Sequence, residues 1–438
     1  MPESRRKRYL SGSDWVINAL DHQLKTTTCA GNICQIVLTL DELLDEGLFR
    51  SQLNRFARQF PVLQGRLARD IRLAPYWKIP SQLKRENSVH VSRLDDISCP
   101  GALLPELTRL ARLPFRDEDE HIAFHLISDS CRSALVMRFD HRLFDARGAE
   151  SFLNRLQQTV RETVPADPIS FNSSAGLCEW REKFRAGTQV NRRMIALSRS
   201  VPRSLPAQTG PDKSFGYRLL CFDRQETDAI FNKAGDMAGY LMESPFFLAA
   251  ITRSLHELFT LRPDQGESYL APVTMDLRPG RDPLQELFFN HVSYLFYQIP
   301  AQSGGDLQEL ASLYKQQMYD QVKSGFPRDL AEASQLSRIA PLPLMARLMR
   351  IPFKGKMATF VFSHLSRSSF QSPEFMGCRV DTILHLPRVP APPGLGFFSS
   401  LFNDRLTLTI AHLDGLLDDG ELDRLERDIR RHMGAEPS

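Results

Sequence analysis

The sequence lacks the features that would assign it to several common classes of protein. Its seven cysteines are scattered through 438 residues, and none forms a Cys-x-x-Cys pair. This pattern is typical of a reduced protein and provides neither a disulfide framework nor a structural zinc site. No apolar run approaches the ~18 residues of a membrane span. The longest candidate, residues 244–255, is interrupted by Arg253.

An excess of charge of one sign is also missing. The 55 Lys and Arg residues nearly balance the 52 Asp and Glu residues, which leaves a formal net charge of +3. So small an excess gives no electrostatic argument for nucleic acid, and we expect no such partner. The basic start at residues 5–8 is not followed by the apolar core of a signal peptide. We therefore expect a cytoplasmic location.

Several catalytic and cofactor-binding motifs are absent as well. The sequence contains no Gly-x-Gly-x-x-Gly, P-loop or His-Glu-x-x-His pattern, and its histidines show no metal-ligand spacing. It also has no Gly-x-Ser-x-Gly elbow, the turn that presents a nucleophilic serine in many hydrolases. We therefore expect no bound cofactor, no metal and no covalent acyl-enzyme.

The sequence does contain a His-x-x-x-Asp pair at a predicted junction between a strand and a helix. His141 and Asp145 follow a strand-like apolar run at 133–137 and precede a helix-like run with apolar residues on one face. A loop between two such elements holds a reactive side chain on a rigid base. His141 is therefore the candidate general base, and Asp145 is expected to fix the loop.

The same spacing occurs a second time, at His125 and Asp129. The pattern alone is weak, because a chain with 11 histidines matches it easily by chance. The second copy lies in an alternating run that ends in the turn-forming pair Asp129-Ser130. We interpret His125 as a sheet residue and Asp129 as a turn former, and the flanking sequence favours His141.

With its flanks, the His141 motif resembles the His-His-x-x-x-Asp-Gly signature of the chloramphenicol acetyltransferase-like superfamily. This superfamily includes condensation domains of nonribosomal peptide synthetases, polyketide-associated acyltransferases and wax ester synthases. Asp140 stands where the first His is usual, and Ala146 stands where the Gly is usual. The early part of the chain is similar too: a predicted strand at 33–40 and an amphipathic helix precede the run Phe60-Pro-Val-Leu-Gln-Gly-Arg-Leu67.

Two later landmarks resemble the second half of the same superfamily. A predicted strand ends in Asp276-Leu-Arg278, and another begins at Asn290, where Phe289 replaces the usual Gly. The resemblance implies that Arg278 pairs with Asp145 and ties two lobes together; the alternative for Arg278 is an exposed turn residue. Ser363, expected after a strand at 357–362, and Asn290 are candidates for binding the substrate oxyanion, although either could be a polar residue at a strand end.

The resemblance implies an α/β (α+β) fold of two chloramphenicol acetyltransferase-like sandwich lobes with a tunnel between them. We expect an N-terminal lobe at 1–165 that carries the His-x-x-x-Asp motif, a crossover at 166–214 and a C-terminal lobe at 215–438. Apolar periodicity in the second lobe predicts four helices, at 224–238, 243–261, 305–324 and 328–350.

The implied activity is transfer of an acyl group from a thioester to a hydroxyl or amine, with His141 as general base. The co-substrate would be acyl-CoA or a phosphopantetheine thioester, and the partners would be small-molecule donor and acceptor, with an acyl carrier protein as a further option. Two alternatives stay open: a carrier-dependent, amide-forming condensation enzyme and an inactive binding protein of this fold.

The stretch at 341–356 mixes apolar residues with four basic ones. We interpret it first as a helix with a solvated basic edge. The sharper interpretation is a contact with the phosphates of coenzyme A or a carrier, or a peripheral contact with an anionic membrane.

Overall fold

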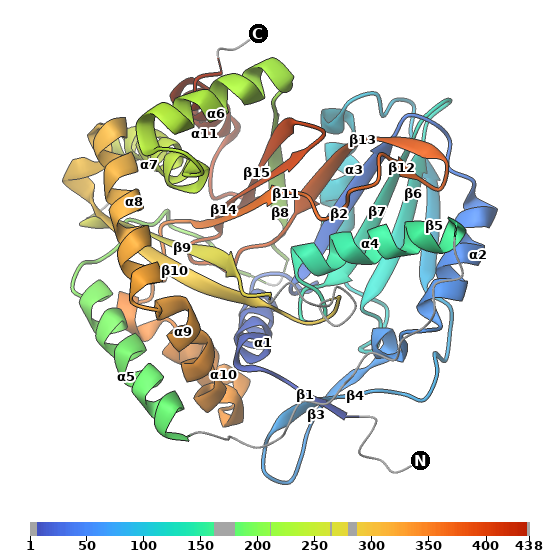
Figure 1. Cartoon of the computed structure of the whole chain (residues 1–438), viewed down its shortest axis with the longest axis horizontal. Coiled ribbons are helices and arrows are strands. Elements are labelled where there is room, and N and C mark those ends of the chain that lie inside the picture. Colours follow the sequence, from blue (N-terminus) through green and yellow to red (C-terminus); the bar gives the residue numbers. More distant parts are fainter. Residues whose placement is uncertain (1–6, 162–179, 211, 263–264, 279–286, 436–438) are drawn as a thin grey trace.

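A computed structural model describes residues 7–161, 180–210, 212–262, 265–278 and 287–435 (Figure 1). Within these ranges, two six-stranded sheets form two lobes that lie side by side, and helices cover the outer faces. This is the mixed α/β architecture expected from the sequence. Part of the predicted crossover, 166–179, lies outside the described residues.

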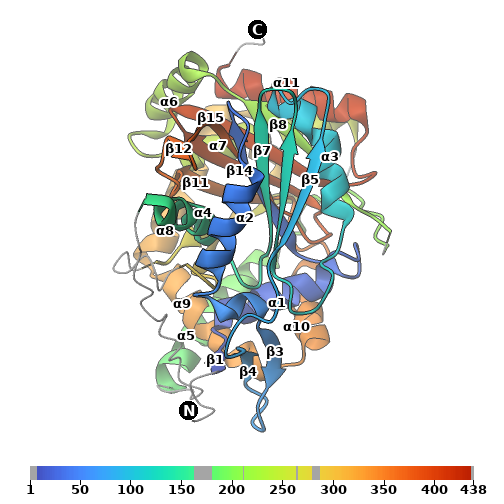
Figure 2. The ribbon, with the colours of Figure 1, turned by 90° about the vertical axis from the view of Figure 1, so that its right-hand side faces the viewer.

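The first sheet has the strand order β12-β13-β2-β7-β6-β5, in which only the β5–β6 pair is parallel. Its strands are β2 (Ile33–Leu40), β5 (Ser88–Arg93), β6 (Ile122–Ser128), β7 (Ser133–Asp140), β12 (Glu374–Phe375) and β13 (Cys378–Leu386). Two helices, α2 (Glu46–Ala57) and α4 (Ala146–Arg161), pack on one face (Figure 2). The amphipathic helix predicted before Phe60 packs into this core, where Phe56 contacts Phe152 edge to face. The other face receives α3 (Pro100–Arg112).

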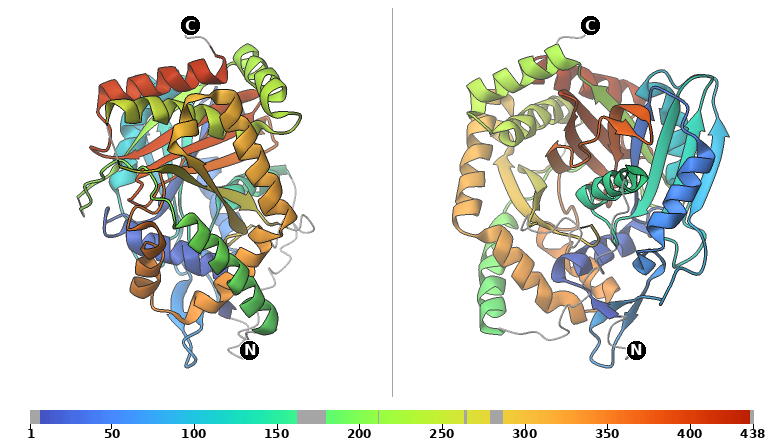
Figure 3. Two further views of the ribbon diagram at one scale, coloured as in Figure 1. Left: turned by 90° about the vertical axis from the view of Figure 1, so that its left-hand side faces the viewer. Right: turned by 45° about the vertical axis from the view of Figure 1, so that its right-hand side comes forward.

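The second sheet has the order β10-β9-β11-β14-β15-β8. Its strands are β8 (Phe215–Cys221), β9 (Ser268–Asp276), β10 (Val292–Pro300), β11 (Val361–Arg367), β14 (Leu395–Phe402) and β15 (Arg405–Leu413). Helices α6 (Arg224–Ala238), α7 (Glu243–Leu261), α8 (Leu307–Lys323) and α11 (Asp419–Met433) lie outside it (Figure 3). The core of this lobe continues into the face of the first sheet that α3 covers, so the lobes share one apolar cluster.

A small third sheet and a group of helices lie at one end of the molecule. The sheet has the order β1-β4-β3 and consists of β1 (Lys7–Tyr9), β3 (Arg66–Arg69) and β4 (Pro75–Lys78). The helical elements are α1 (Gly12–Leu24), α5 (Trp180–Leu197), α9 (Phe326–Ser334), η4 (Gln335–Ile339), α10 (Leu342–Leu348) and η5 (Ile351–Phe353). The short 3₁₀ turns η2 (Pro61–Gln64) and η3 (Ala301–Gly305) complete the described elements.

Two sequence predictions in this region are wrong. The single helix expected at 328–350 is divided into α9, η4 and α10. The break before α10 falls at Pro341, which lacks the N–H that a continuing helix would need. The strand expected at 357–362 begins only at Val361 and runs on to Arg367. Ser363 therefore lies inside a strand and not after it.

The polypeptide returns to the first lobe near its C-terminal end. Strands β12 and β13 come from residues 374–386, yet β13 pairs along β2 and completes the first sheet. The lobe limits expected from the sequence stay a prediction, but this sheet contains residues from both halves of the chain. No helix within the described ranges has the length and apolar composition needed to cross a membrane.

Candidate functional site

His141 is held at the end of β7, where the first sheet meets the second lobe. Its backbone N–H donates to the carbonyl of Asn32, with 3.0 Å between N and O. Its Nδ1 lies 3.1 Å from Oδ1 of Asn290, a residue 149 positions further along the chain. The side chain is half-buried and lines a chamber between the lobes. Each lobe therefore contributes to the placement of this imidazole.

Asn290 determines which nitrogen of His141 is free. Its Nδ2 donates to the carbonyl of His141 at 3.0 Å, so Oδ1 of the amide must face Nδ1 of the ring. Because Oδ1 can only accept, the neutral form of the ring carries its proton on Nδ1 and its lone pair on Nε2. The backbone N–H of Asn290 donates to Oδ1 of Asp14, which is buried at the start of α1, at 3.0 Å. Asn290 is thus placed to orient His141, and its amide N–H groups are not directed at a substrate oxyanion.

The chamber beside His141 has a volume of about 520 Å³. Its wall is largely apolar, with Val16 and Leu20 from α1, Met345 from α10 and Met349 directly after α10. A concave, apolar cavity with a few convergent polar groups is the usual form of a small-molecule site. Methionine side chains are flexible and polarizable, so a wall that contains them adapts to different apolar ligands.

Asp145 forms a buried ion pair with Arg278, as the resemblance implied. Nη2 of Arg278 donates to Oδ1 of Asp145 at 2.5 Å, and the backbone N–H groups of Gly148 and His291 donate to the same carboxylate at 2.9 and 3.1 Å. Burial by itself would raise the pKa of Asp145, but Arg278 and these donors hold the pKa below its usual value. Asp145 is not among the residues that line the chamber, and its carboxylate joins the residue before α4 to the segment just after β9.

Asp140, which replaces the first His of the usual motif, has a different set of partners. It is buried and accepts hydrogen bonds from Nδ1 of His121 at 2.9 Å and Nη2 of Arg142 at 2.7 Å. Nε2 of His121 lies 2.8 Å from the carbonyl oxygen of Gly65, so each ring nitrogen faces an oxygen that can accept a hydrogen bond. Burial opposes the charge of Asp140, but Arg142 and His121 keep its pKa low. This cluster supports the strand end from which His141 projects.

Phe289, which replaces the usual Gly, adopts backbone geometry that favours glycine. Its φ is +75°, in the left-handed region that bulky side chains rarely occupy. The ring is buried, and the Arg8 guanidinium lies 4.7 Å from the ring centroid. The backbone of Phe289 also bridges to Phe144 in the His141 loop. These contacts hold a strained residue next to Asn290.

Ser363 is not among the residues that line the chamber. Its hydroxyl accepts a hydrogen bond from Oγ1 of Thr274 at 2.7 Å, and it is Thr274 that lines the chamber. Sequence reasoning missed Thr274, Asp14 and Asn32. Thr274 could have been found from its position near the end of the strand that leads into Asp276-Leu-Arg278. Asp14 could have been found from its position at the start of a predicted helix. Nothing in the sequence pointed to Asn32.

The second His-x-x-x-Asp copy is structural, as interpreted. His125 lies within β6, and its ring stacks on His90 with 4.7 Å between centroids. Asp129 closes the turn between β6 and β7 by accepting from the backbone N–H groups of Cys131 and Arg132 at 2.8 Å each.

His125 should make the protein less stable in acid. Burial, assisted by the nearby Arg138 charge, lowers the pKa of His125 from 6.5 to about 3. Below pH 6.5, His125 therefore binds a proton in the unfolded chain but not in the folded chain. The folding stability is lost as pH falls from about 6.5 toward 3. Urea unfolding at pH 7 and pH 4 measures this. We expect His125→Phe to lose less stability between these pH values than the wild type; an equal loss would exclude His125 as the cause.

Within the described part of the chain, no cluster of three or more His, Cys, Asp or Glu residues could hold a metal ion. No family model matches the chain, and no curated protein sequence does either.

Solved structures do match it. A trichothecene 15-O-acetyltransferase from Fusarium sporotrichioides is 14% identical with a TM-score of 0.73, and the match covers 99% of this chain and 96% of that one. The first condensation domain of the calcium-dependent antibiotic synthetase is 14% identical with a TM-score of 0.71, over 100% and 98% of the two chains. The starter condensation domain of rhizomide synthetase is 14% identical with a TM-score of 0.67, over 98% and 94%. The chain therefore has the two-lobed chloramphenicol acetyltransferase-like fold.

Proposed function

We propose that this chain, with its chloramphenicol acetyltransferase-like fold, is an acyltransferase that moves an acyl group from a thioester to a hydroxyl or amine. One observation carries the proposal: His141 lies in a chamber between the lobes, with its Nδ1 proton directed at Asn290. No hydrogen bond from a described residue occupies its Nε2. An imidazole in this state is equipped to accept a proton.

In the proposed mechanism the acceptor attacks the thioester carbonyl directly. As its oxygen or nitrogen forms the new bond to carbon, Nε2 of His141 takes the proton. Collapse of the tetrahedral intermediate breaks the carbon–sulfur bond, and the imidazolium returns the proton to the departing thiolate. Asn290 keeps the ring in the required tautomer, and the Asp145–Arg278 pair fixes the loop. Thr274, backed by Ser363, is the proposed polar contact for the substrate.

The donor is proposed to be acyl-CoA or the phosphopantetheine thioester of an acyl carrier protein. The likeness to an acetyltransferase supports the first choice. The likeness to condensation domains, one of them in complex with C8-CoA, supports a second candidate, an amide-forming condensation enzyme. In both cases the lobes at 1–165 and 215–438 would bind the two substrates between them. A purely binding role is the less favoured alternative, because His141, Asp145 and Arg278 are all retained and in place.

The proposal is tested by following thiol release from a panel of acyl-CoAs, from acetyl to palmitoyl, with alcohol or amine acceptors present or omitted. We expect release that depends on the acceptor and a product of matching mass. If free CoA esters are inert but a loaded carrier domain reacts, the condensation enzyme is the correct candidate. If no donor of either kind reacts with any acceptor, acyl transfer is wrong.

A further inference from the structure

One end of the molecule exposes apolar side chains that nothing within the described residues covers. The hairpin between β3 and β4 carries Ile71, which is 100% exposed, and the exposed Leu73. The start of the segment 339–356 lies next to this hairpin, because Arg69 on β3 donates to the carbonyls of Ile339 and Ala340 at 3.0 and 2.9 Å. Figures 1 and 2 place the hairpin and α10 at the same end, opposite α11. We call residues 70–74 and 339–356 the docking face.

Within the docking face, two apolar stripes run along α10, the turn after it and η5. One stripe, Met345, Met349 and Phe353, points into the chamber beside His141. The other consists of the exposed residues Leu344, Leu348 and Ile351, of which Ile351 is 63% exposed. Single exposed apolar residues are ordinary on protein surfaces, but a stripe at helical spacing indicates a partner. Leu348 belongs to the chamber wall and to the surface, so the two apolar regions are continuous.

The charges of the docking face are almost all positive. Residues 339–356 contain Arg347, Arg350, Lys354 and Lys356 and no acidic residue. Arg72 lies at the hairpin tip, where the carboxylate of Asp70 already accepts from the backbone N–H groups of residues 72 and 74. Exposed apolar residues interspersed with basic ones are the pattern of a surface that lies on an anionic bilayer, with apolar side chains inserted and cations at the headgroups.

We propose that the docking face binds an anionic lipid surface. An acidic carrier domain would also be attracted by the charges. The lipid is favoured because the docking face exposes apolar side chains as well as charges. The fully exposed Ile71 at the hairpin tip and the exposed apolar stripe that starts on α10 can insert into the apolar layer of a membrane. Binding to lipid is independent of acyl transfer. Bound in this way, the protein would hold the Leu348 side of its chamber against the membrane.

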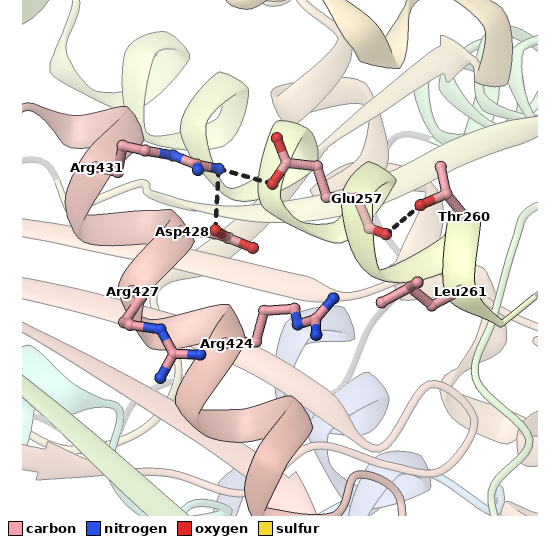
Figure 4. Close-up of a pocket in the computed structure, with 7 residues that line it drawn as sticks. All are labelled: Glu257, Thr260, Leu261, Arg424, Arg427, Asp428 and Arg431. Carbon is pink, nitrogen blue, oxygen red and sulfur yellow. Dashed lines mark hydrogen bonds and ion pairs between the residues drawn. The ribbon is translucent and has the colours of Figure 1, made fainter.

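The opposite end of the molecule provides a matched control. There α11 and the end of α7 form a pocket with Arg424, Arg427, Arg431 and the exposed Leu261 (Figure 4). It differs from the docking face because acidic residues lie among the arginines: Arg431 pairs with Glu257 at 2.7 Å and with Asp428 at 2.9 Å. Basic and apolar side chains are therefore present at both ends, but at the α11 end carboxylates pair with the arginines, whereas residues 339–356 contain no acidic residue.

The test is co-sedimentation with vesicles of phosphatidylcholine alone or with an equal part of phosphatidylglycerol. We expect the wild type to bind the mixed vesicles, less so as salt is raised, and to bind phosphatidylcholine weakly. Arg72→Gln, Arg347→Gln and Lys354→Gln combined should weaken binding about 100-fold, since each basic residue at such a surface contributes about fivefold. Ile71→Ser with Ile351→Ser should weaken it at least about tenfold.

The control variant, Leu261→Ser with Arg427→Gln, should bind the mixed vesicles as the wild type does, and circular dichroism should show every variant folded. The proposal is overturned if the wild type does not bind the mixed vesicles, or if the control variant loses as much binding as the docking-face variants. It is also overturned if the docking-face variants bind vesicles normally and instead lose binding to an acidic acyl carrier domain.

Discussion

Replacing His141 with alanine should lower the rate of acyl transfer by about 10²–10⁴-fold, the usual contribution of a positioned general base. The acceptor would lose the lone pair on Nε2 that receives its proton. The side chain is only half-buried, and its removal leaves Asn290 still bonded to the backbone carbonyl of residue 141. We therefore expect an unchanged thermal midpoint. Initial rates of thiol release at saturating donor and acceptor give the measurement.

His125→Phe is the matched control, because it alters the other His-x-x-x-Asp copy and leaves the chamber untouched. It should retain the wild-type rate at pH 7. Asn290→Ala should lie between the two, with a reduced kcat and little change in KM, because the imidazole is present but no longer oriented. The general-base assignment fails if His141→Ala keeps the wild-type rate, or if His125→Phe loses as much activity.

Replacing Arg278 with alanine should cost about 3–5 kcal/mol of folding free energy, the usual loss when one partner of a buried ion pair is removed. The carboxylate of Asp145 is buried and would remain there with only backbone donors. Asp145→Ala should be similarly costly. The double variant should cost less than the sum of the two, because the second change removes a charge that is already unpaired. Urea denaturation at pH 7 measures all three.

Arg379→Ala provides the comparison for a surface pair, since Arg379 bonds Asp41 on an exposed part of the first sheet. Its loss should cost less than about 1 kcal/mol. If Arg278→Ala lowers the folding free energy no more than Arg379→Ala does, the Asp145–Arg278 pair does not hold the two lobes together. If the two single variants add without coupling, they destabilise the protein through separate contacts.

Long, strongly periodic segments were predictable from the sequence. The helices at 224–238 and 243–261 and the strand at 33–40 have the expected limits, because a sustained apolar face leaves few alternatives to one element type. The strand β14 was missed. It is buried on both faces and so shows no alternation, and prolines and two glycines at its start resemble a loop.

The site was predictable only in part, for a similar reason. His141 and Asp145 share a short motif, so they could be found together. The orientation of His141 depends on Asn290, which in turn is held by Asp14, 276 positions away. No local pattern records a contact of that kind. Asn290 was expected to bind a substrate oxyanion, but its side-chain amide bonds the backbone carbonyl and Nδ1 of His141 instead.

The return of β13 to the first sheet has a consequence for how the chain is synthesised. Strand β2 pairs with β7 on one side and with β13 on the other. Strand β7 ends at residue 140, but β13 is complete only at residue 386. At ~5–20 residues per second, the ribosome needs roughly 10 to 50 s to deliver it. During that interval β2, with the apolar sequence Ile-Cys-Gln-Ile-Val-Leu-Thr-Leu, is an unpaired edge. A nascent or truncated first lobe would therefore depend on chaperones, and it would be a poor unit to express alone.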